Sequence, residues 1–179
     1  GRPCENFGQN GIIDAMTGLP RAIREDRDYL NAILFSIQSP PIVVRDTVIH
    51  GSSIADRRIT KEAVPGWVRS WDVRTGEHAW DFHTVPNGAD EFGADTWLNE
   101  SWRYTGNTGV WGQISVDTEL GIVYLPTEMP TNDYYGGHRH GDNRPHLSRR
   151  KPHPKLLPFD ENGKHTLAQT VLTFPLWNL

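Results

Sequence analysis

The segment SWDVRTGEHAW (residues 70–80) constrains the fold more than any other feature of the sequence. Asp72 can accept the backbone N–H groups that follow it and so close a tight turn. Gly76 can adopt the positive φ with which such a turn ends. Trp80 then starts the run WDFHTV, in which alternate side chains lie on one side of a strand. The segment predicts a strand, a tight turn and a second strand with a large aromatic residue.

Two more hairpins are predicted elsewhere in the chain. The runs IVV and TVI in residues 39–53 are short, β-branched and separated by Arg45 and Asp46. Residues 110–117 (VWGQISVD) and 121–127 (GIVYLPT) form a second pair of short strands. Seventeen Gly, 13 Pro and seven Trp favour short strands with long loops over helices.

Composition excludes several classes of protein. A net charge near −4 gives no reason to expect a nucleic-acid partner. The single cysteine, Cys4, excludes an internal disulfide and a cysteine-rich metal site. The sequence contains no run of 18 apolar residues, so no membrane span is predicted. The opening GRPCENFG lacks an initiator Met and a signal peptide, so we expect the sequence to be a fragment.

Related turns recur at long spacing, around Gly1, Gly76 and Gly163, with Leu167 at the place that corresponds to Trp80. A recurring strand–turn–strand unit is typical of the blades of a propeller, with loops inserted between strands. Trp80 would then pack between adjacent blades. In a chain of so few blades we also expect Trp67, Trp71 and Trp80 to be partly uncovered.

The segment 70–80 resembles the tryptophan-docking motif of the quinoprotein dehydrogenases, which use pyrroloquinoline quinone (PQQ). The resemblance extends through GSSIADRR, FHTVPNGADEFGADTW, ESWRYTGNTGVWGQISVDTELGIVYLPT and PTNDYYGGHRHGDN, and covers residues 1–143 almost without a break. It implies an all-β partial β-propeller with long loops: about two blades plus part of a third, out of the family's eight. We expect residues 1–143 to be this propeller segment, and 144–179 to be a divergent basic linker followed by a degraded blade motif.

The branch that the sequence resembles most is that of the membrane-bound glucose dehydrogenases. The resemblance implies a fragment of an oxidoreductase that transfers hydride from a sugar or alcohol hydroxyl to PQQ, with Ca²⁺ as a Lewis acid. It also implies a quinone or cytochrome as electron acceptor and a periplasmic location, with inner-membrane association through a part outside this chain. The isolated chain would lack the remaining blades and would be inactive.

The resemblance assigns cofactor contacts to five residues. Trp111 matches the indole that lies flat beneath PQQ. Ser53, Ile54 and Ala55 match a segment near the carboxylates of the cofactor, where backbone N–H groups are offered. Gln38 stands where many relatives have a Thr that touches the cofactor.

The metal ligands implied by the resemblance are Asp56, in GSSIADRR, and Thr131, in MPTNDYYGG. Both supply the oxygen atoms that Ca²⁺ prefers. Two departures from the family lie beside them. Arg57 places a cation next to Asp56, and Met129 occupies the place of an Asn that ligates calcium in the alcohol branch; a thioether does not ligate a hard ion.

No catalytic base is predicted. The segment TFPLWNL (173–179) resembles a strand end of the family, HHDLWD, whose first Asp accepts the proton. Pro175 takes that place here and Asn178 takes the place of the second acid. Neither acts as a general base near neutral pH.

Alternative interpretations remain open on the sequence. In one alternative the chain is a non-catalytic propeller scaffold or interaction segment. In another it is a carbohydrate-binding surface that uses exposed aromatic residues such as Tyr134 and Tyr135. His138 and His140 would form a small chelate on a strand, but two solvated histidines of a loop explain them as well. The acidic loop of 90–100 would hold a surface cation or simply be solvated.

Overall fold

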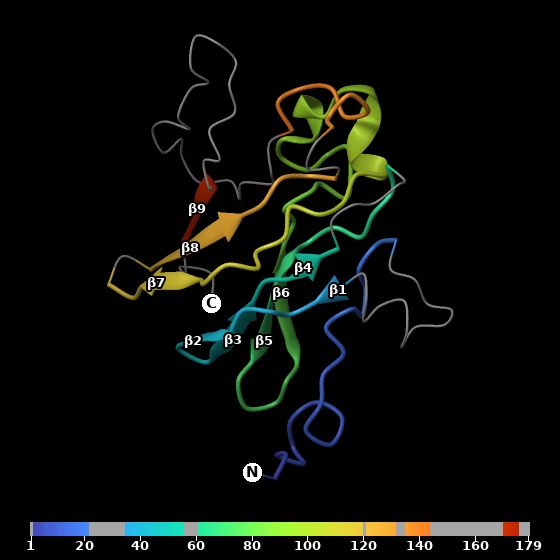
Figure 1. Cartoon of the computed structure of the whole chain (residues 1–179). Helices are drawn as coiled ribbons and strands as arrows, with labels where there is room; N and C mark the ends of the chain where they lie inside the picture. The colour runs from blue at the N-terminus through green and yellow to red at the C-terminus, as the bar shows by residue number, and fades with distance from the viewer. Residues whose placement is uncertain are drawn as a thin grey trace.

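The computed structural model describes residues 2–21, 35–55, 61–119, 121–131 and 135–143, and the backbone of 170–175. Within these residues the helices are two short 3-10 segments, η1 (Ala94–Thr96) and η2 (Leu98–Arg103). The other elements are strands joined by long loops, as Figure 1 shows, which confirms the all-β prediction. No helix in the described residues is long and apolar enough to cross a membrane.

The largest sheet has four antiparallel strands in the order β2-β3-β5-β6. The sheet has the strand number and meander order of a propeller blade (Figure 1). Arg45 has a φ of 53° at the turn between the first two strands, so the hairpin predicted within 39–53 is confirmed. The four strands are β2 (Ile42–Val44), β3 (Thr47–His50), β5 (Val68–Asp72) and β6 (His78–Phe82).

The turn between β5 and β6 forms as predicted. The backbone N–H groups of Arg74 and Thr75 each donate to Asp72 Oδ1 over 2.8 Å. Gly76 has a φ of 70° and donates to the Asp72 carbonyl over 2.9 Å. The N–H groups of Thr75 and then Arg74 lower the pKa of the Asp72 carboxyl, because they bind its charged form.

A three-stranded antiparallel sheet contains β7 (Ser115–Asp117), β8 (Ile122–Thr127) and β9 (Thr170–Pro175). β7 and β8 form the second predicted hairpin, although the strand begins at Ser115 rather than at residue 110. The backbone of β9 pairs with all of β8. A separate antiparallel pair joins β1 (Phe35–Ser36) to β4 (Ser53–Ile54).

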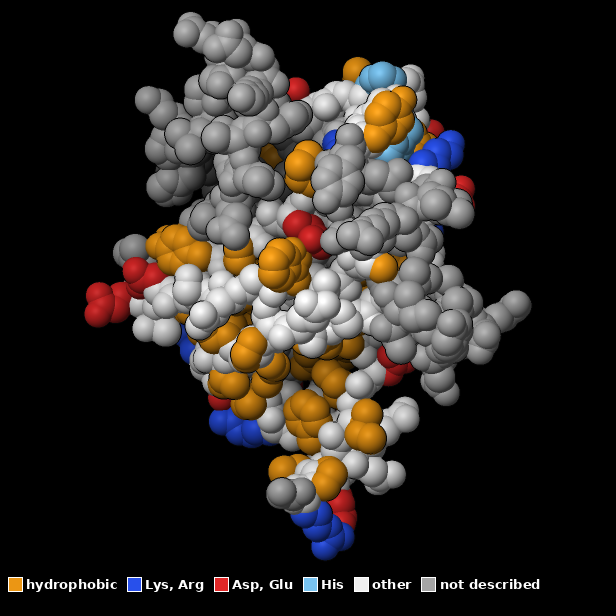
Figure 2. Space-filling model, viewed as in Figure 1, with side chains coloured by type: hydrophobic (Ala, Val, Ile, Leu, Met, Phe, Trp, Pro, Cys, Tyr) orange, Lys and Arg blue, Asp and Glu red, His pale blue; other side chains and the backbone are white. Residues whose placement is uncertain are grey.

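One hydrophobic cluster joins the four-stranded sheet to the β7–β8 hairpin. Trp80 is half-buried and packs against this cluster, which supports the expected role of Trp80 between blades. In Figure 2 further hydrophobic side chains reach the surface over the same sheets. The buried members of the cluster are Val44, Ile49, Val68, Phe82, Val110, Ile114, Val123 and Leu125.

The expectation that Trp67 and Trp71 are partly uncovered is wrong, since they are only 4% and 6% exposed. Trp67 stacks on the His83 ring with 3.7 Å between ring centroids, and its Nε1 donates to the Val85 carbonyl over 3.1 Å. Trp71 Nε1 donates to Nε2 of His50 over 2.9 Å. Local partners within this chain therefore cover both indoles.

Arg69 ties the N-terminal segment to the four-stranded sheet. Its guanidinium is buried and contacts Asp81, with Nε 2.7 Å from Oδ1. Nη1 donates over 2.7 Å to the carbonyls of Ala15 and Thr17. Burial raises the pKa of Asp81, but hydrogen bonds from Arg69 and His78 outweigh this effect and hold the pKa below its usual value.

Asp81→Asn is expected to destabilise the fold by about 1.5–3 kcal/mol at pH 7, because a charge-assisted hydrogen bond to a buried Arg is weakened. A lowered native pKa contributes stability above the unfolded pKa and loses it as pH falls through the native value. The difference in melting temperature between the wild type and Asp81→Asn should therefore shrink below about pH 4.

Thermal melts followed by circular dichroism between pH 2 and 8 would measure this difference. Asp46→Asn is the matched control, since Asp46 pairs with Arg74 on the surface, where both side chains are about two-thirds exposed. If the difference in melting temperature between the wild type and Asp81→Asn stayed constant down to pH 2, the charged pairing of Asp81 with Arg69 would be contradicted.

Candidate cofactor site

The segment GNTG (106–109) lies between two other backbone segments, 63–66 and 128–131. It forms a parallel bridge with the first at Pro65 and an antiparallel bridge with the second at Pro130. The supporting hydrogen bonds are Gly66 N to Asn107 O (2.7 Å), Asn107 N to Val64 O (2.9 Å), Glu128 N to Gly109 O (2.9 Å), Thr131 N to Gly106 O (3.0 Å) and Thr108 N to Met129 O (3.2 Å).

Glycines allow these segments to approach closely. A Cβ atom on Gly106 would lie 2.4 Å from the Ala63 carbonyl oxygen, and one on Gly109 would lie 2.3 Å from the Ser52 carbonyl oxygen. The backbone of 51–52 is thereby held against 109–110. Three segments that are distant in the sequence, 51–55, 106–111 and 128–131, meet at one place.

Gly106→Ala is expected to cost at least about 3 kcal/mol of stability, because the new methyl group meets backbone atoms that cannot rotate away. Gly136→Ala is the control, since a Cβ there meets only the flexible Arg139 side chain at 3.4 Å. Urea unfolding of the two variants would measure the difference. Equal midpoints would show that the packing of 106 against 63 is not required.

His50 fixes the start of the 51–55 segment. Because Trp71 donates to Nε2, the ring proton lies on Nδ1, which donates to the Gly51 carbonyl over 2.9 Å. Burial lowers the pKa of His50, so the ring is neutral near pH 7. The tryptophan of β5 is thus linked to the candidate site through one histidine, whose role the sequence did not predict.

Trp111 follows directly from the GNTG segment, and its side chain is 51% exposed. Among the tryptophans in the described residues it is the most exposed, so part of this residue is accessible to a ligand. Ser39 Oγ donates to the Trp111 carbonyl, which brings the 38–39 segment beside it. Gln38 is exposed next to this contact, and its Nε2 lies 3.4 Å from Ser36 Oγ.

Ser53 and Ile54 form β4, and Ala55 follows the strand, close in sequence to the Ser52 carbonyl that Gly109 contacts. The Ile54 side chain is buried in a cluster with Phe35 and Trp67, and its backbone lies opposite Phe35 in the β1–β4 pair. Ser53 and Ala55 are half-buried. The cofactor contacts implied for these three residues stay predictions.

Thr131 is buried, and its hydroxyl has no hydrogen-bond partner in the described part of the chain. Its carbonyl accepts from His138 Nε2 over 2.7 Å and from Arg139 Nε over 3.0 Å. A cation could therefore reach Thr131 only through Oγ1, close to a guanidinium. His138 Nε2 donates to the Thr131 carbonyl, and no group of three or more metal-ligating side chains occurs among the described residues.

Asp56, Arg57 and Tyr134 lie outside the described residues, so their assignments stay predictions. Of Pro175 only the backbone is described; it pairs with Ile122 at the end of β9. Asn178 also lies outside the described range.

The oxygen atoms around GNTG are of the kind that bind a hard cation. Besides Thr131, the hydroxyls of Ser52 and Thr108 are buried without a hydrogen-bond partner in the described segments. Buried hydroxyls are normally bonded, so a site with three unpaired ones fits a polar or metal-bearing group. Glu128 Oε1 is also buried here, 2.8 Å from the position of a Cβ on Gly109.

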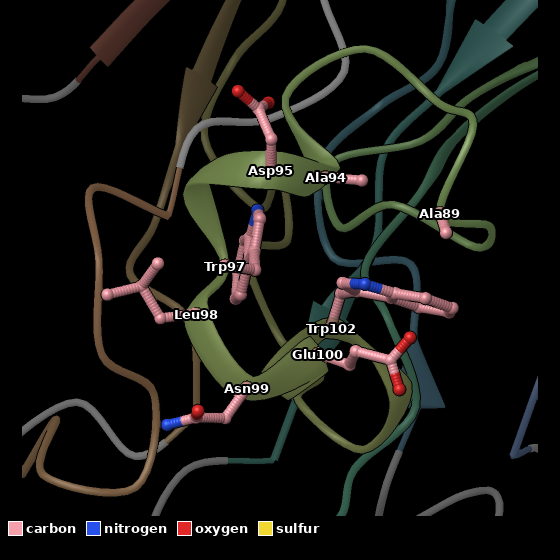
Figure 3. Close-up of a pocket in the computed structure, with 8 residues that line it drawn as sticks. All are labelled: Ala89, Ala94, Asp95, Trp97, Leu98, Asn99, Glu100 and Trp102. Carbon is pink, nitrogen blue, oxygen red and sulfur yellow. The ribbon is translucent and has the colours of Figure 1, made fainter.

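A separate pocket of about 260 Å³ lies at the two 3-10 helices. In Figure 3 the carboxylates of Asp95 and Glu100 point away from each other, on opposite sides of the pocket. Glu100 pairs instead with Arg103, at 2.8 Å, and Glu91 with His83, at 2.9 Å. These carboxylates do not converge as a surface cation site would require. The lining residues are Ala89, Ala94, Asp95, Trp97, Leu98, Asn99, Glu100 and Trp102.

Comparison with known proteins places this geometry in a family. The family model for the β-propeller domain of PQQ-dependent glucose/ethanol/alcohol dehydrogenases matches residues 1–148. Quinoprotein glucose dehydrogenase A of Acinetobacter calcoaceticus is 33% identical over 140 residues, which are 78% of this chain and 16% of that protein. Subunit 1 of methanol dehydrogenase [cytochrome c] of Paracoccus denitrificans is 31% identical over 150 residues, 74% of this chain and 22% of that protein.

A solved structure agrees with the sequence comparison. The europium-containing methanol dehydrogenase superposes with a TM-score of 0.51 at 26% identity, and covers 62% of this chain and 21% of that one. The chain thus spans less than a quarter of each of these relatives. By its strands, its ordered motifs and these matches, the chain belongs to the family of PQQ-dependent glucose/ethanol/alcohol dehydrogenase β-propeller domains and forms part of such a propeller.

Proposed function

We propose that the chain is part of a dehydrogenase that oxidises a sugar or alcohol hydroxyl by hydride transfer to PQQ, with Ca²⁺ as the metal. The observation that supports this most is the accessible indole of Trp111 at the junction of 51–55 with 106–111. A planar tricyclic quinone gains from stacking on a wide aromatic face. The family match covers this whole junction.

We assign to the other residues the roles that the family resemblance implies. The backbone of Ser53, Ile54 and Ala55 binds the cofactor carboxylates, and Gln38 contacts the cofactor from the neighbouring segment. Asp56 and Thr131 supply oxygen ligands to the metal. When bound, PQQ supplies the hydride acceptor and Ca²⁺ the Lewis acid.

The names of the relatives support the remaining proposals. They include a quinate/shikimate dehydrogenase (quinone) of Acinetobacter baylyi and the methanol dehydrogenase [cytochrome c] subunit already described. We propose a quinone or a cytochrome as electron acceptor. We also propose a periplasmic location, with glucose or a short alcohol as substrate.

The isolated chain is expected to show no PQQ-dependent turnover of glucose or ethanol with an artificial electron acceptor. Pro175 stands where the family has its proton acceptor, and a proline side chain does not accept a proton. Assays with and without added PQQ and Ca²⁺ would measure this. PQQ-dependent oxidation of either substrate would contradict the expectation, whereas inactivity is also what a non-catalytic scaffold would show.

A measurement of PQQ binding distinguishes a fragment that holds part of the cofactor site from a non-catalytic scaffold. PQQ is expected to quench the tryptophan fluorescence of the chain saturably, and Trp111→Ala should weaken binding at least tenfold because the stacking face is lost. Tyr135→Ala is the control, since it removes another exposed aromatic side chain, 66% exposed, from a different loop. Quenching no greater than that of free tryptophan would leave only the scaffold function.

A further inference from the structure

The side chain of Arg21 reaches two segments that are distant from it in the sequence. Its Nε donates to the Ala63 carbonyl over 2.8 Å, and its Nη2 donates to the Thr105 carbonyl over 2.7 Å. Its Nη1 donates to the Arg103 carbonyl over 3.0 Å. A planar guanidinium holds its donors in a fixed fork, so this one side chain sets the spacing between residue 63 and the 103–105 segment.

The carbonyls that Arg21 binds lie where the GNTG segment begins. The Thr105 carbonyl belongs to the peptide group that leads into Gly106, and Gly106 packs against Ala63. Ala63 and Thr105 are buried, and the described residues offer these two carbonyls no other hydrogen-bond donor. Loss of the guanidinium would therefore leave two carbonyls unpaired at the start of GNTG.

The N-terminal segment is held to the protein by contacts other than those of Arg21. Arg69 binds this segment through the carbonyls of Ala15 and Thr17. Leu19 is buried in a hydrophobic cluster. The three hydrogen bonds of Arg21 thus matter most on their other side, for the backbone of 63 and 103–105.

Two costs accompany this arrangement. The φ of Arg21 is 58°, a left-handed conformation that is uncommon for residues other than glycine. Such strain persists where surrounding contacts fix it, and it concentrates at functional sites. Burial lowers the pKa of Arg21 to about 10, and the charge of Glu62 opposes this effect in part, so the guanidinium stays protonated near pH 7.

We propose that Arg21 is a positioning residue of the cofactor site, a role that neither the sequence motifs nor the comparisons assign to it. It acts through the backbone: by fixing the Ala63 and Thr105 carbonyls, it sets the course of GNTG and of Trp111, which follows two residues after that segment. The inference rests on the proposed function, because Trp111 is the residue proposed to stack on PQQ.

The first measurement is amide hydrogen exchange of the 179-residue chain, followed by mass spectrometry. Arg21→Lys keeps the charge, but one ammonium group does not reproduce the fork of three donors. The amides of Asn107 and Thr108, which donate to Val64 and Met129, should therefore exchange at least tenfold faster than in wild type. The amides of the β5–β6 hairpin (68–82) should change less than twofold.

Arg74→Lys is the matched control, because Arg74 is 69% exposed and pairs with Asp46 on the surface. It should leave the exchange of 106–111 within twofold of wild type. The second measurement is the affinity for PQQ, from the quenching of tryptophan fluorescence. Arg21→Lys should weaken PQQ binding at least fivefold, and Arg74→Lys less than twofold.

Unchanged exchange of 106–111 in Arg21→Lys would overturn the proposal. An equal acceleration in 106–111 and in 68–82 would also overturn it, because Arg21 would then support the stability of the whole fold and not the site. Circular dichroism would check the fold, and an unfolded Arg21→Lys would overturn the proposal for the same reason.

The two measurements together separate this proposal from the proposed function. Wild type that PQQ does not quench, with faster exchange confined to 106–111 in Arg21→Lys, would contradict the cofactor and support the positioning of this segment by Arg21. Equal PQQ affinities of wild type and Arg21→Lys would support the cofactor and contradict the positioning role.

Discussion

The contact between glycine backbones around 106–109 is the constraint on which the rest of the site depends. Gly106 and Gly109 bring this segment against 63–64 and 52 at distances that no side chain allows. Hydrogen bonds to 128–131 complete the arrangement. These contacts join 106–109 to residues more than 40 positions earlier and to residues 19 to 25 positions later, so they bring together the segments for which cofactor contacts are proposed.

The aromatic motif and the site are parts of one structure. Trp71 belongs to the strand before the Asp72 turn, yet its N–H bonds His50, and His50 bonds the Gly51 carbonyl. Gly51 then packs against Val110, where a Cβ would lie 2.2 Å from the carbonyl oxygen. The motif that defines the sheet therefore also orients the backbone beside Trp111.

Local features could be predicted from the sequence, and long-range ones could not. The turn at Asp72 depends on hydrogen bonds within three residues, so its residues alone predict it. Trp67 is covered by the ring of His83, and the N-terminal segment is held to the sheet by the hydrogen bond from Arg69 to the Ala15 carbonyl. No local sequence pattern predicts either contact. Family motifs indicated Trp111, but no local pattern predicts that His50 links Trp71 to the Gly51 carbonyl.

The segment 128–131 has hydrogen-bond donors beside one end and a carboxylate at the other. At one end Arg139 and His138 donate to the Thr131 carbonyl, and at the other Glu128 has a buried carboxylate oxygen. A cofactor with carboxylates and a bound cation needs positive groups near the former and negative groups near the latter. Arg139, which donates to the Thr131 carbonyl, therefore favours an anionic group of a ligand over a cation on that side of the segment.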